Sequence, residues 1–338
     1  MKKSSNKLRI IAITIFSLGL ILLATGWVMG ANFMLYIDGG SIRFANEHSV
    51  SLSNNLEFSS ISITSNIADI EITATAVSFS ANFFTYFNNV NFNYYVEHGT
   101  LFIEISKEAS FIFPIGFTAI ESKLVLNIPN ELALNMVTVN NFSNDTLIEG
   151  ITTSYLRINS ISGNANVYDV NSDLGSIHLV NGNGLFNNAT FSLLEFASVD
   201  GSNTFIDSAF SEIIAGSGGE ANFSFYNCAV SSFNINTRYG NIIAEDLVTN
   251  EMVVHNIFGD IILTGNFNGR SEISNNSGNT TLHIAGAETE FGYNLTTRGN
   301  VFINGNTVIG TLADRAVPNH LRVISRTGNI IIMFLEDE

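Results

Sequence analysis

A glycine-anchored motif recurs about every 19 residues through the second half of the chain, a period typical of repeat proteins. Each copy has a small anchor residue, usually glycine, then a polar residue, and an apolar residue four positions after the anchor. The anchors are Asn144, Gly163, Gly182, Gly201, Gly219, Gly240, Gly259, Gly278, Gly299 and Gly328. The differences between successive anchor numbers are 19, 19, 19, 18, 21, 19, 19, 21 and 29. Such a regular pattern predicts a stack of repeats rather than the core of a globular enzyme.

Two positions of the repeat have the character of buried strand residues. The residue four positions after the anchor is apolar in every copy, and the residue five positions before it is β-branched or aromatic in nine of ten copies. Such side chains suit a pleated surface better than a helix. We therefore predict an all-β fold, a β-solenoid like a parallel β-helix, with coils of about 19 residues. In this phasing Phe205 lies inside the coil, between Phe186 and Phe223.

The polar residue after each anchor predicts a ladder along one corner of the solenoid. If the coils stack in register, these side chains hydrogen-bond from coil to coil, as Asn ladders do in stacked β structure. The predicted ladder residues are Asn164, Asn183, Asn241, Asp260, Asn279, Asn300 and Asn329, with Glu220 between Ser202 and Asn241. An ordinary meander of hairpins with Gly-Asn turns is the alternative. A meander, however, does not require a near-constant period.

The end regions are less regular than the repeats. We predict that residues 31–135 form irregular N-terminal coils and a cap, and that residues 136–338 form the regular solenoid. The last strand, residues 330–335, is followed by three acidic residues, which discourage pairing with another chain, so it should end the stack. The wide final spacing between anchors predicts a bulge over about residues 304–320, where Pro318 disfavours a central strand.

The first 30 residues have the composition of a membrane anchor. Residues 1–9 contain four basic residues and no acid, and residues 10–30 are almost entirely apolar. At 1.5 Å per residue the apolar segment spans roughly 30 Å, the thickness of a bilayer core. The basic flank predicts a cytoplasmic tail at 1–9, one transmembrane helix at 10–30 and an extracellular remainder. A cleaved signal peptide is the alternative, although its apolar core is normally shorter.

The predicted extracellular part is strongly acidic. The whole chain has a formal net charge of −16, and four of its 14 basic residues but none of its 30 acidic residues precede the apolar segment. This balance excludes nucleic acid, whose phosphates require a basic surface. A single cysteine, Cys228, excludes an intramolecular disulfide framework.

Several segments together resemble a known family. The short basic start with a single apolar span, the alternating residues 61–72 and 124–129, and Gly-Asn turns such as residues 326–330 resemble a bacterial putative-adhesin family. The resemblance covers about residues 55–335. It implies a membrane-anchored β-solenoid in the cell envelope, with no established catalytic residues.

The sequence offers no convincing catalytic or metal-binding group. His178 and His255 fall in one outward column, but four coils separate them by about 19 Å, too far to share a metal ion. Glycoside hydrolysis usually needs two carboxyl groups roughly 5–9.5 Å apart. In the ladder column neither Glu220 nor Asp260 has a carboxylate neighbour. We therefore predict no catalytic residue, no metal and no cofactor.

Aromatic residues near the N-terminal end of the repeats are the most unusual candidate for a binding surface. Rings occur throughout residues 83–95 and again at Phe111, Phe113 and Phe117. One interpretation is that they close the end of the solenoid core. The other is an exposed patch that contacts a partner, since large apolar patches usually mark interaction sites. We name Phe111, Phe113 and Phe117 as the candidate partner-binding residues.

These observations favour a non-enzymatic, single-pass cell-envelope protein whose extracellular β-solenoid is an adhesive or binding scaffold. Repeated neutral polar side chains offer many weak, equivalent contacts, which suits an envelope polysaccharide or a surface protein. One alternative is a carbohydrate-active β-helix enzyme of the envelope. Another is a structural β-helix that assembles with itself.

Overall fold

The computed structural model describes residues 12–21, 25, 35–38, 41–44, 48–52, 56–76, 78–108, 112–115, 122–308, 312–313 and 316–335. The chain forms two compact units. The larger contains residues 49–84, 90–107 and 122–338, and the smaller contains residues 1–48, 85–89 and 108–121. Most of the described chain is β-strand, which confirms the all-β class.

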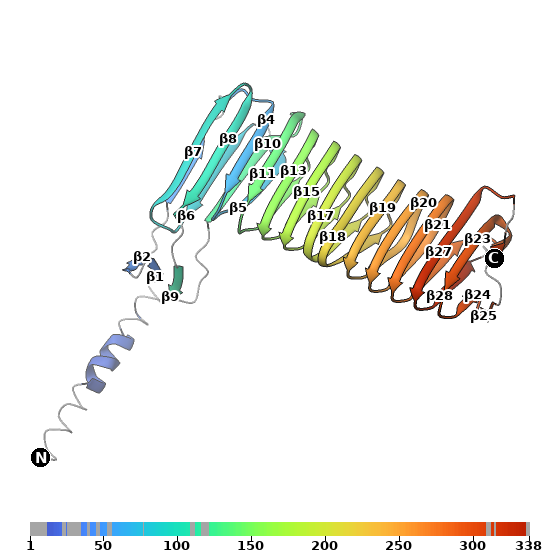
Figure 1. The fold of residues 1–338 in the computed structure, drawn as a ribbon. Helices are drawn as coiled ribbons and strands as arrows, with labels where there is room; N and C mark the ends of the chain where they lie inside the picture. Colours follow the sequence, from blue (N-terminus) through green and yellow to red (C-terminus); the bar gives the residue numbers. More distant parts are fainter. Residues whose placement is uncertain are drawn as a thin grey trace, which may run out of the picture. The chain divides into compact units, whose positions relative to one another are not determined.

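The centre of the larger unit is a stack of parallel coils joined in sequence order (Figure 1). Its strands are β11 (Leu134–Asn141), β12 (Thr146–Glu149), β13 (Thr152–Ser162), β14 (Ala165–Tyr168), β15 (Asn171–Asn181), β16 (Gly184–Asn187), β17 (Thr190–Ile206), β18 (Ala209–Tyr226), β19 (Ala229–Tyr239), β20 (Ile242–Phe258), β21 (Ile261–Ser277) and β22 (Thr280–Ala285). Ile158 pairs with Ile177, and Ile177 pairs with Phe196, so the numbers of paired residues in these successive coils differ by 19. Parallel pairing at a constant offset is the arrangement of a solenoid, and a hairpin meander lacks it.

Each coil presents three faces, because the alternation of buried and exposed side chains is interrupted at the corners. In β15, for example, Asp173 and Leu174 are both exposed, which marks one corner. We name the faces from one coil: the anchor face contains residues 165–168, the narrow face residues 171–173 and the long face residues 175–181. Inward side chains from all three faces form one continuous apolar core.

The core contains a column of stacked phenylalanine rings. Phe205 is fully buried, as predicted. Its ring stacks on Phe186 at 4.8 Å and on Phe225 at 4.7 Å between ring centres. The neighbour of Phe205 in the next coil is therefore Phe225, and the predicted neighbour Phe223 was wrong.

The same correction applies to one anchor of the repeat. Gly201 pairs with Ala221, so Ala221 and not Gly219 occupies the anchor position of that coil. The pairing of β18 shifts between Ser217 and Glu220, which shows that β18 carries an extra residue at this point. An extra residue in one strand is a β-bulge. Gly219, which the sequence suggested as the anchor, belongs to this bulge.

At the N-terminal end the coils are not stacked in sequence order. The strands are β4 (Ser60–Ser65), β5 (Asp69–Ala76), β8 (Thr100–Lys107) and β10 (Ser122–Pro129), with β3 (His48–Leu52), β6 (Ser80–Thr85) and β7 (Val90–Glu97) further out. The β4–β5 coil lies between the later β8–β10 coil and the β11–β12 coil. The β4–β5 coil therefore comes first in the sequence but second in the stack, and the later β8–β10 coil lies outside it.

The C-terminal end shows the same interleaving. It contains β23 (Phe291–Thr297), β24 (Val301–Ile303), β25 (Asn306–Thr307), β26 (Leu312–Ala313), β27 (Asn319–Thr327) and β28 (Ile330–Leu335), with a short 3-10 helix at Glu288–Glu290. Strand β27 pairs with β21 on one side and β23 on the other, and β28 lies in the same way between β22 and β24. The expectation that residues 330–335 end the stack was therefore wrong. The wide final spacing, between Gly299 and Gly328, includes the connection that brings the chain back into the slot between the β21–β22 coil and the β23–β24 coil.

The smaller unit contains a three-stranded antiparallel sheet in the order β2 (Ser41–Phe44), β1 (Leu35–Asp38), β9 (Ile112–Ile115). Phe113 lies in β9 and pairs with Ile37 of β1, whereas Phe111 and Phe117 lie outside the described residues. Within the described chain no helix is long and apolar enough to span a membrane. Residues 12–21 and 25 of the predicted transmembrane segment are helical, and the rest of that segment lies outside the described residues.

Candidate functional site

A hydrogen-bonded ladder runs along the corner at the anchors and contains the predicted ladder residues except Glu220. Each side-chain oxygen accepts a hydrogen bond from the backbone N–H of the corresponding residue in the next coil. The N–H of Asn183, for example, donates to Asn164 Oδ1 at 2.9 Å. The ladder comprises one run through Asp145, Asn164, Asn183 and Ser202, and a second through Asn222, Asn241, Asp260, Asn279, Asn329 and Asn300.

Glu220 does not occupy the ladder position that the sequence suggested. Asn222 is paired with Ser202, and its Oδ1 accepts from the N–H of Asn241 at 2.8 Å. The backbone N–H of Glu220 instead donates to Asp200 Oδ1 at 2.9 Å. Asp200 and Glu220 are therefore acidic residues on adjacent coils, a juxtaposition that the sequence phasing missed.

A second ladder lies at the corner between the anchor and narrow faces. Asp169, Asn188, Asp207, Asn227 and Asp246 all have positive φ, between 49° and 55°. Asn188 Nδ2 donates to Asp169 Oδ1, and Asn227 Nδ2 donates to Asp207 Oδ1, both at 2.6 Å. Asn and Asp tolerate this left-handed conformation better than other residues with side chains. The sequence carries this signal in part: the sixth residue after Gly163, Gly182, Gly201 and Gly240 is Asp or Asn, and Asn227 is the sixth residue after Ala221.

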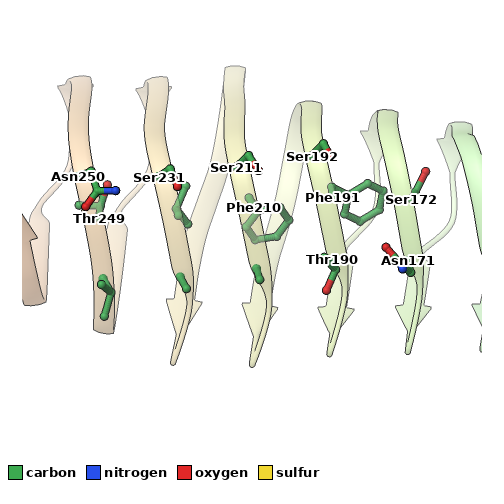
Figure 2. A pocket seen from close by; sticks show the side chains of 14 residues that line it. Asn171, Ser172, Thr190, Phe191, Ser192, Phe210, Ser211, Ser231, Thr249 and Asn250 are labelled. Atoms are coloured by element: carbon green, nitrogen blue, oxygen red, sulfur yellow. The ribbon is translucent and has the colours of Figure 1, made fainter.

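The narrow face contains a groove of about 330 Å³ that crosses five coils (Figure 2). Its lining side chains are all uncharged. Ser192, Ser211, Ser231 and Asn250 form one row of exposed polar groups, while Phe191 and Phe210 point away from that row into the core. Five coils correspond to a length of about 19 Å. The groove is thus a neutral strip with hydroxyl or amide groups repeated at the coil spacing.

The long face contains a hollow of about 630 Å³ beside the bulge of β18. Gly216 and Gly218 line it without side chains, and a side-chain carbon added at Gly218 would meet nothing within 4 Å. Val180, Val199 and Ile214 supply exposed apolar surface around the hollow. Its polar lining residues include His178, Glu195, Asn234 and Asn236. The bulge therefore opens a partly apolar depression in an otherwise regular face.

Further exposed apolar side chains lie along the edge of the long face. Phe142 and Ile161 precede Val180 and Val199 in the same column of successive coils, and all four are exposed. Beyond the bulge, the exposed rings of Tyr239 and Phe258 stack at 5.1 Å, and the Arg238 guanidinium lies 5.3 Å from the centre of the Tyr239 ring. A row of exposed apolar groups on one face is typical of an interaction surface.

The described residues contain no group of three or more His, Cys, Asp or Glu side chains arranged to hold a metal ion. Cys228 is buried, and its thiol donates weak hydrogen bonds to the carbonyl oxygens of Phe205 and Tyr226. Burial raises the pKa of the Cys228 thiol, which favours the unreactive protonated form. His178 lines the long-face hollow, and within the described part of the chain no hydrogen bond joins its ring to a carboxylate or a hydroxyl, as a catalytic triad would require.

Parallel pairing, a coil offset close to 19 residues and two side-chain ladders define a β-solenoid of short coils. The model of the Toastrack DUF4097 family matches residues 58–303, and the chain belongs to this family. The family assignment confirms the resemblance found in the sequence. No curated protein sequence matches the chain at a significant level.

Solved structures that match the chain include proteins of three bacteria. A putative adhesin from Bacteroides fragilis is 12% identical, with 86% of this chain and 97% of that chain covered and a TM-score of 0.41. A putative lipid binding protein from Parabacteroides distasonis is 14% identical, with coverages of 85% and 96% and a TM-score of 0.39. A putative cell adhesion protein from Clostridium sporogenes is 11% identical, with coverages of 86% and 100% and a TM-score of 0.22.

Proposed function

We propose that the chain is a non-enzymatic, membrane-anchored scaffold of the cell envelope that binds an extended, uncharged, hydroxyl-rich polymer along the narrow-face groove. An envelope polysaccharide has this chemistry. The observation that carries the proposal is the neutrality of the groove: its 14 lining residues include no charged side chain, in a protein with a net charge of −16. A neutral polymer can approach this strip without the repulsion that an anionic one would meet.

The repeated geometry of the groove suits a polymer better than a small molecule. Each hydroxyl or amide contact contributes only about 0.5–1.5 kcal/mol. The same contact recurs in successive coils, so a polymer that lies along the groove makes several at once, and the second and later contacts form at high effective concentration. Phe191 and Phe210 are buried beneath the groove, so stacking on exposed rings contributes little there.

The membrane anchor in this proposal rests on the sequence. The basic residues of 1–9 followed by the apolar residues of 10–30 support insertion with the solenoid outside the cell. Protease added to intact cells should degrade the part beyond residue 31 and spare a tag at the N-terminus. A C-terminus that is protected in intact cells would exclude the external location.

The groove is tested with the full-length chain and a panel of neutral and anionic polysaccharides. Ser211→Arg combined with Ser231→Arg places two long charged side chains in the groove and should weaken binding of a neutral glycan at least tenfold. The matched control is Ser224→Arg, which lies on the anchor face of β18. Equal binding by the double variant and the control would show that the groove is not the binding site.

The carbohydrate-active alternative has one specific observation in its favour. Asp200 and Glu220 are acidic residues on adjacent coils, and retaining glycosidases use two carboxyl groups about 5 Å apart. Against it, Asp200 Oδ1 already accepts the Glu220 N–H and so has a structural role. Release of new reducing ends from a bound polysaccharide, abolished by Glu220→Gln, would replace the scaffold proposal with the enzyme.

A further inference from the structure

Among the described strands, β7 is an edge strand at the N-terminal end of the long face. It pairs antiparallel with β8 over residues 90–97 with no shift in register, and no other described strand pairs with it (Figure 1). Natural proteins block such edges with short strands, bulges, proline or lysine. Strand β7 has eight residues, contains no proline or lysine, and carries a single charge at Glu97. Within the described part of the chain, its outer edge therefore remains available for pairing with another β-strand.

The turn between β7 and β8 determines which backbone groups face outward. His98 and Gly99 form this turn and both have positive φ, 49° and 72°, as in a two-residue type I′ hairpin. In such a hairpin the flanking pair, here Glu97 with Thr100, is hydrogen-bonded, and bonded pairs then alternate along the strands. The N–H and C=O groups of Val90, Phe92, Tyr94 and Val96 consequently point to the free edge.

The side chains of β7 retain apolar surface that the described chain does not cover. Phe92 stacks on the buried Phe83 at 4.9 Å and helps to close the core, as the capping interpretation expected. Tyr94 and Val96, on the same side of β7 as Phe92, remain 46% and 37% exposed. Some rings of the N-terminal cluster therefore close the core, and others remain exposed.

The opposite end of the solenoid is covered differently. There the outermost strands β23 and β24 pair with the short antiparallel strands β26 and β25 of the same chain. A filament would require complementary free edges at both ends, whereas a two-fold dimer requires only one self-complementary edge. This asymmetry disfavours the self-assembling filament and leaves a closed dimer.

We propose that β7 pairs antiparallel with β7 of a second copy of this chain, so that the two solenoids share a continuous sheet. The outward backbone groups fix the register. A two-fold axis at Asn93 makes Val90 pair with Val96 of the second copy and Phe92 with Tyr94, and every outward N–H then meets a carbonyl. Cross-strand pairs of aromatic or β-branched side chains are favourable, and here they cover Tyr94 and Val96.

The charges of β7 are consistent with this pairing. In the antiparallel arrangement Glu97 lies just beyond Val90 of the second copy. The two copies of Glu97 are therefore at opposite ends of the paired strands. A parallel arrangement would place the two copies of Glu97 side by side, which is destabilising. The dimer is independent of polymer binding, because the narrow-face groove lies in coils 171–250.

The full-length chain in detergent should sediment as a dimer, and Tyr94→Pro should shift the dimer dissociation constant at least tenfold toward the monomer. Proline removes an outward N–H of an edge strand and leaves the hydrogen bonds to β8 in place. Far-UV circular dichroism checks that this variant stays folded. A wild-type protein that is monomeric at all concentrations would overturn the proposal.

Cysteine cross-linking tests the register without relying on the proline variant. In a Cys228→Ser background, Asn93→Cys places two thiols across the axis, where opposed residues have Cα atoms about 4.5 Å apart, within reach of a disulfide. The matched control is Tyr95→Cys, whose two copies would lie about 13 Å apart because each is offset by four residues. Oxidation should link the first variant into dimers and not the second. Equal or reversed cross-linking would refute the register and with it the dimer.

Discussion

Replacement of Phe205 by alanine should destabilise the solenoid by about 4–5 kcal/mol, the upper half of the range of roughly 3–5 kcal/mol for a buried Phe→Ala change. The upper half applies because the change also removes stacked ring pairs, which contribute beyond the buried area. Phe205 is fully buried, stacks on Phe186 and Phe225, and makes edge contacts with Phe196 and Phe210. A loss of this size is a large fraction of the stability of a typical domain.

Urea unfolding followed by circular dichroism measures the effect, and hydrogen exchange locates it. Because each coil contacts only its neighbours, protection should fall first in β16, β17 and β18. The control Phe258→Ala removes a ring that is 44% exposed and should change stability by less than about 1 kcal/mol. A Phe205→Ala effect within about 1 kcal/mol of this control would refute the buried ring column.

A double-mutant cycle tests the register of the ring column. Phe205 and Phe225 are stacked, so their alanine variants should show a coupling energy of about 0.5–1.5 kcal/mol. Phe223 pairs with Asn203 and not with Phe205, so the coupling energy between Phe223 and Phe205 should be smaller. A stronger coupling to Phe223 would restore the phasing inferred from the sequence.

The ladders, the anchors and the buried thiol give three further predictions. Asn241→Leu removes an acceptor of a backbone N–H in the next coil and should lower stability by about 1 kcal/mol in urea unfolding, whereas Asn306→Leu, in an exposed two-residue strand, should not. Gly240→Ala should cost about 2–3 kcal/mol, because φ is +130° and the added carbon would overlap a carbonyl oxygen, while Gly218→Ala, with open space, should leave the melting temperature unchanged. Burial raises the pKa of the Cys228 thiol above its ordinary value of 9.0. The contribution of the thiol to the unfolding free energy is therefore complete below pH 9.0 and is lost as the pH rises through the pKa of the folded state. Cys228→Ala should lack this loss of unfolding free energy at alkaline pH.

The repeat could be predicted because its signals are local. Ile158 and Ile177 pair at the offset that the spacing gave, and Asn164 and Asn183 meet as expected from stacking in register. Part of the second ladder was also visible, since Asp169, Asn188, Asp207 and Asp246 each lie six residues after a glycine anchor. It was missed because the glycine anchors account for only one of the two left-handed positions in each coil.

The bulge and the coil order could not be predicted from the period. The spacing from Gly201 to Gly240 is the same whether Gly219 or Ala221 is the anchor between them. The period therefore favoured the glycine, although Ala221 is the residue that pairs with Gly201. At the ends, any strand with an apolar inward face satisfies the pattern equally well. Which strand enters the slot between β21 and β23 depends on tertiary packing, and the carboxylate pair at Asp200 and Glu220 depends on the bulge.

The interleaved ends determine where the protein can change in length and when it can finish folding. From the β11–β12 coil to the β21–β22 coil the coils stack in sequence order, so a duplicated or deleted coil can be accommodated there without disturbing either end. The slot for β27 and β28 exists only once β21 to β24 are in place. During synthesis β27 and β28 must leave the ribosome before that slot can be filled, so the stack cannot be completed by simple addition of coils in the order of translation. The number of coils can therefore change in the centre of the solenoid, while the interleaved coils fix the structure of its two ends.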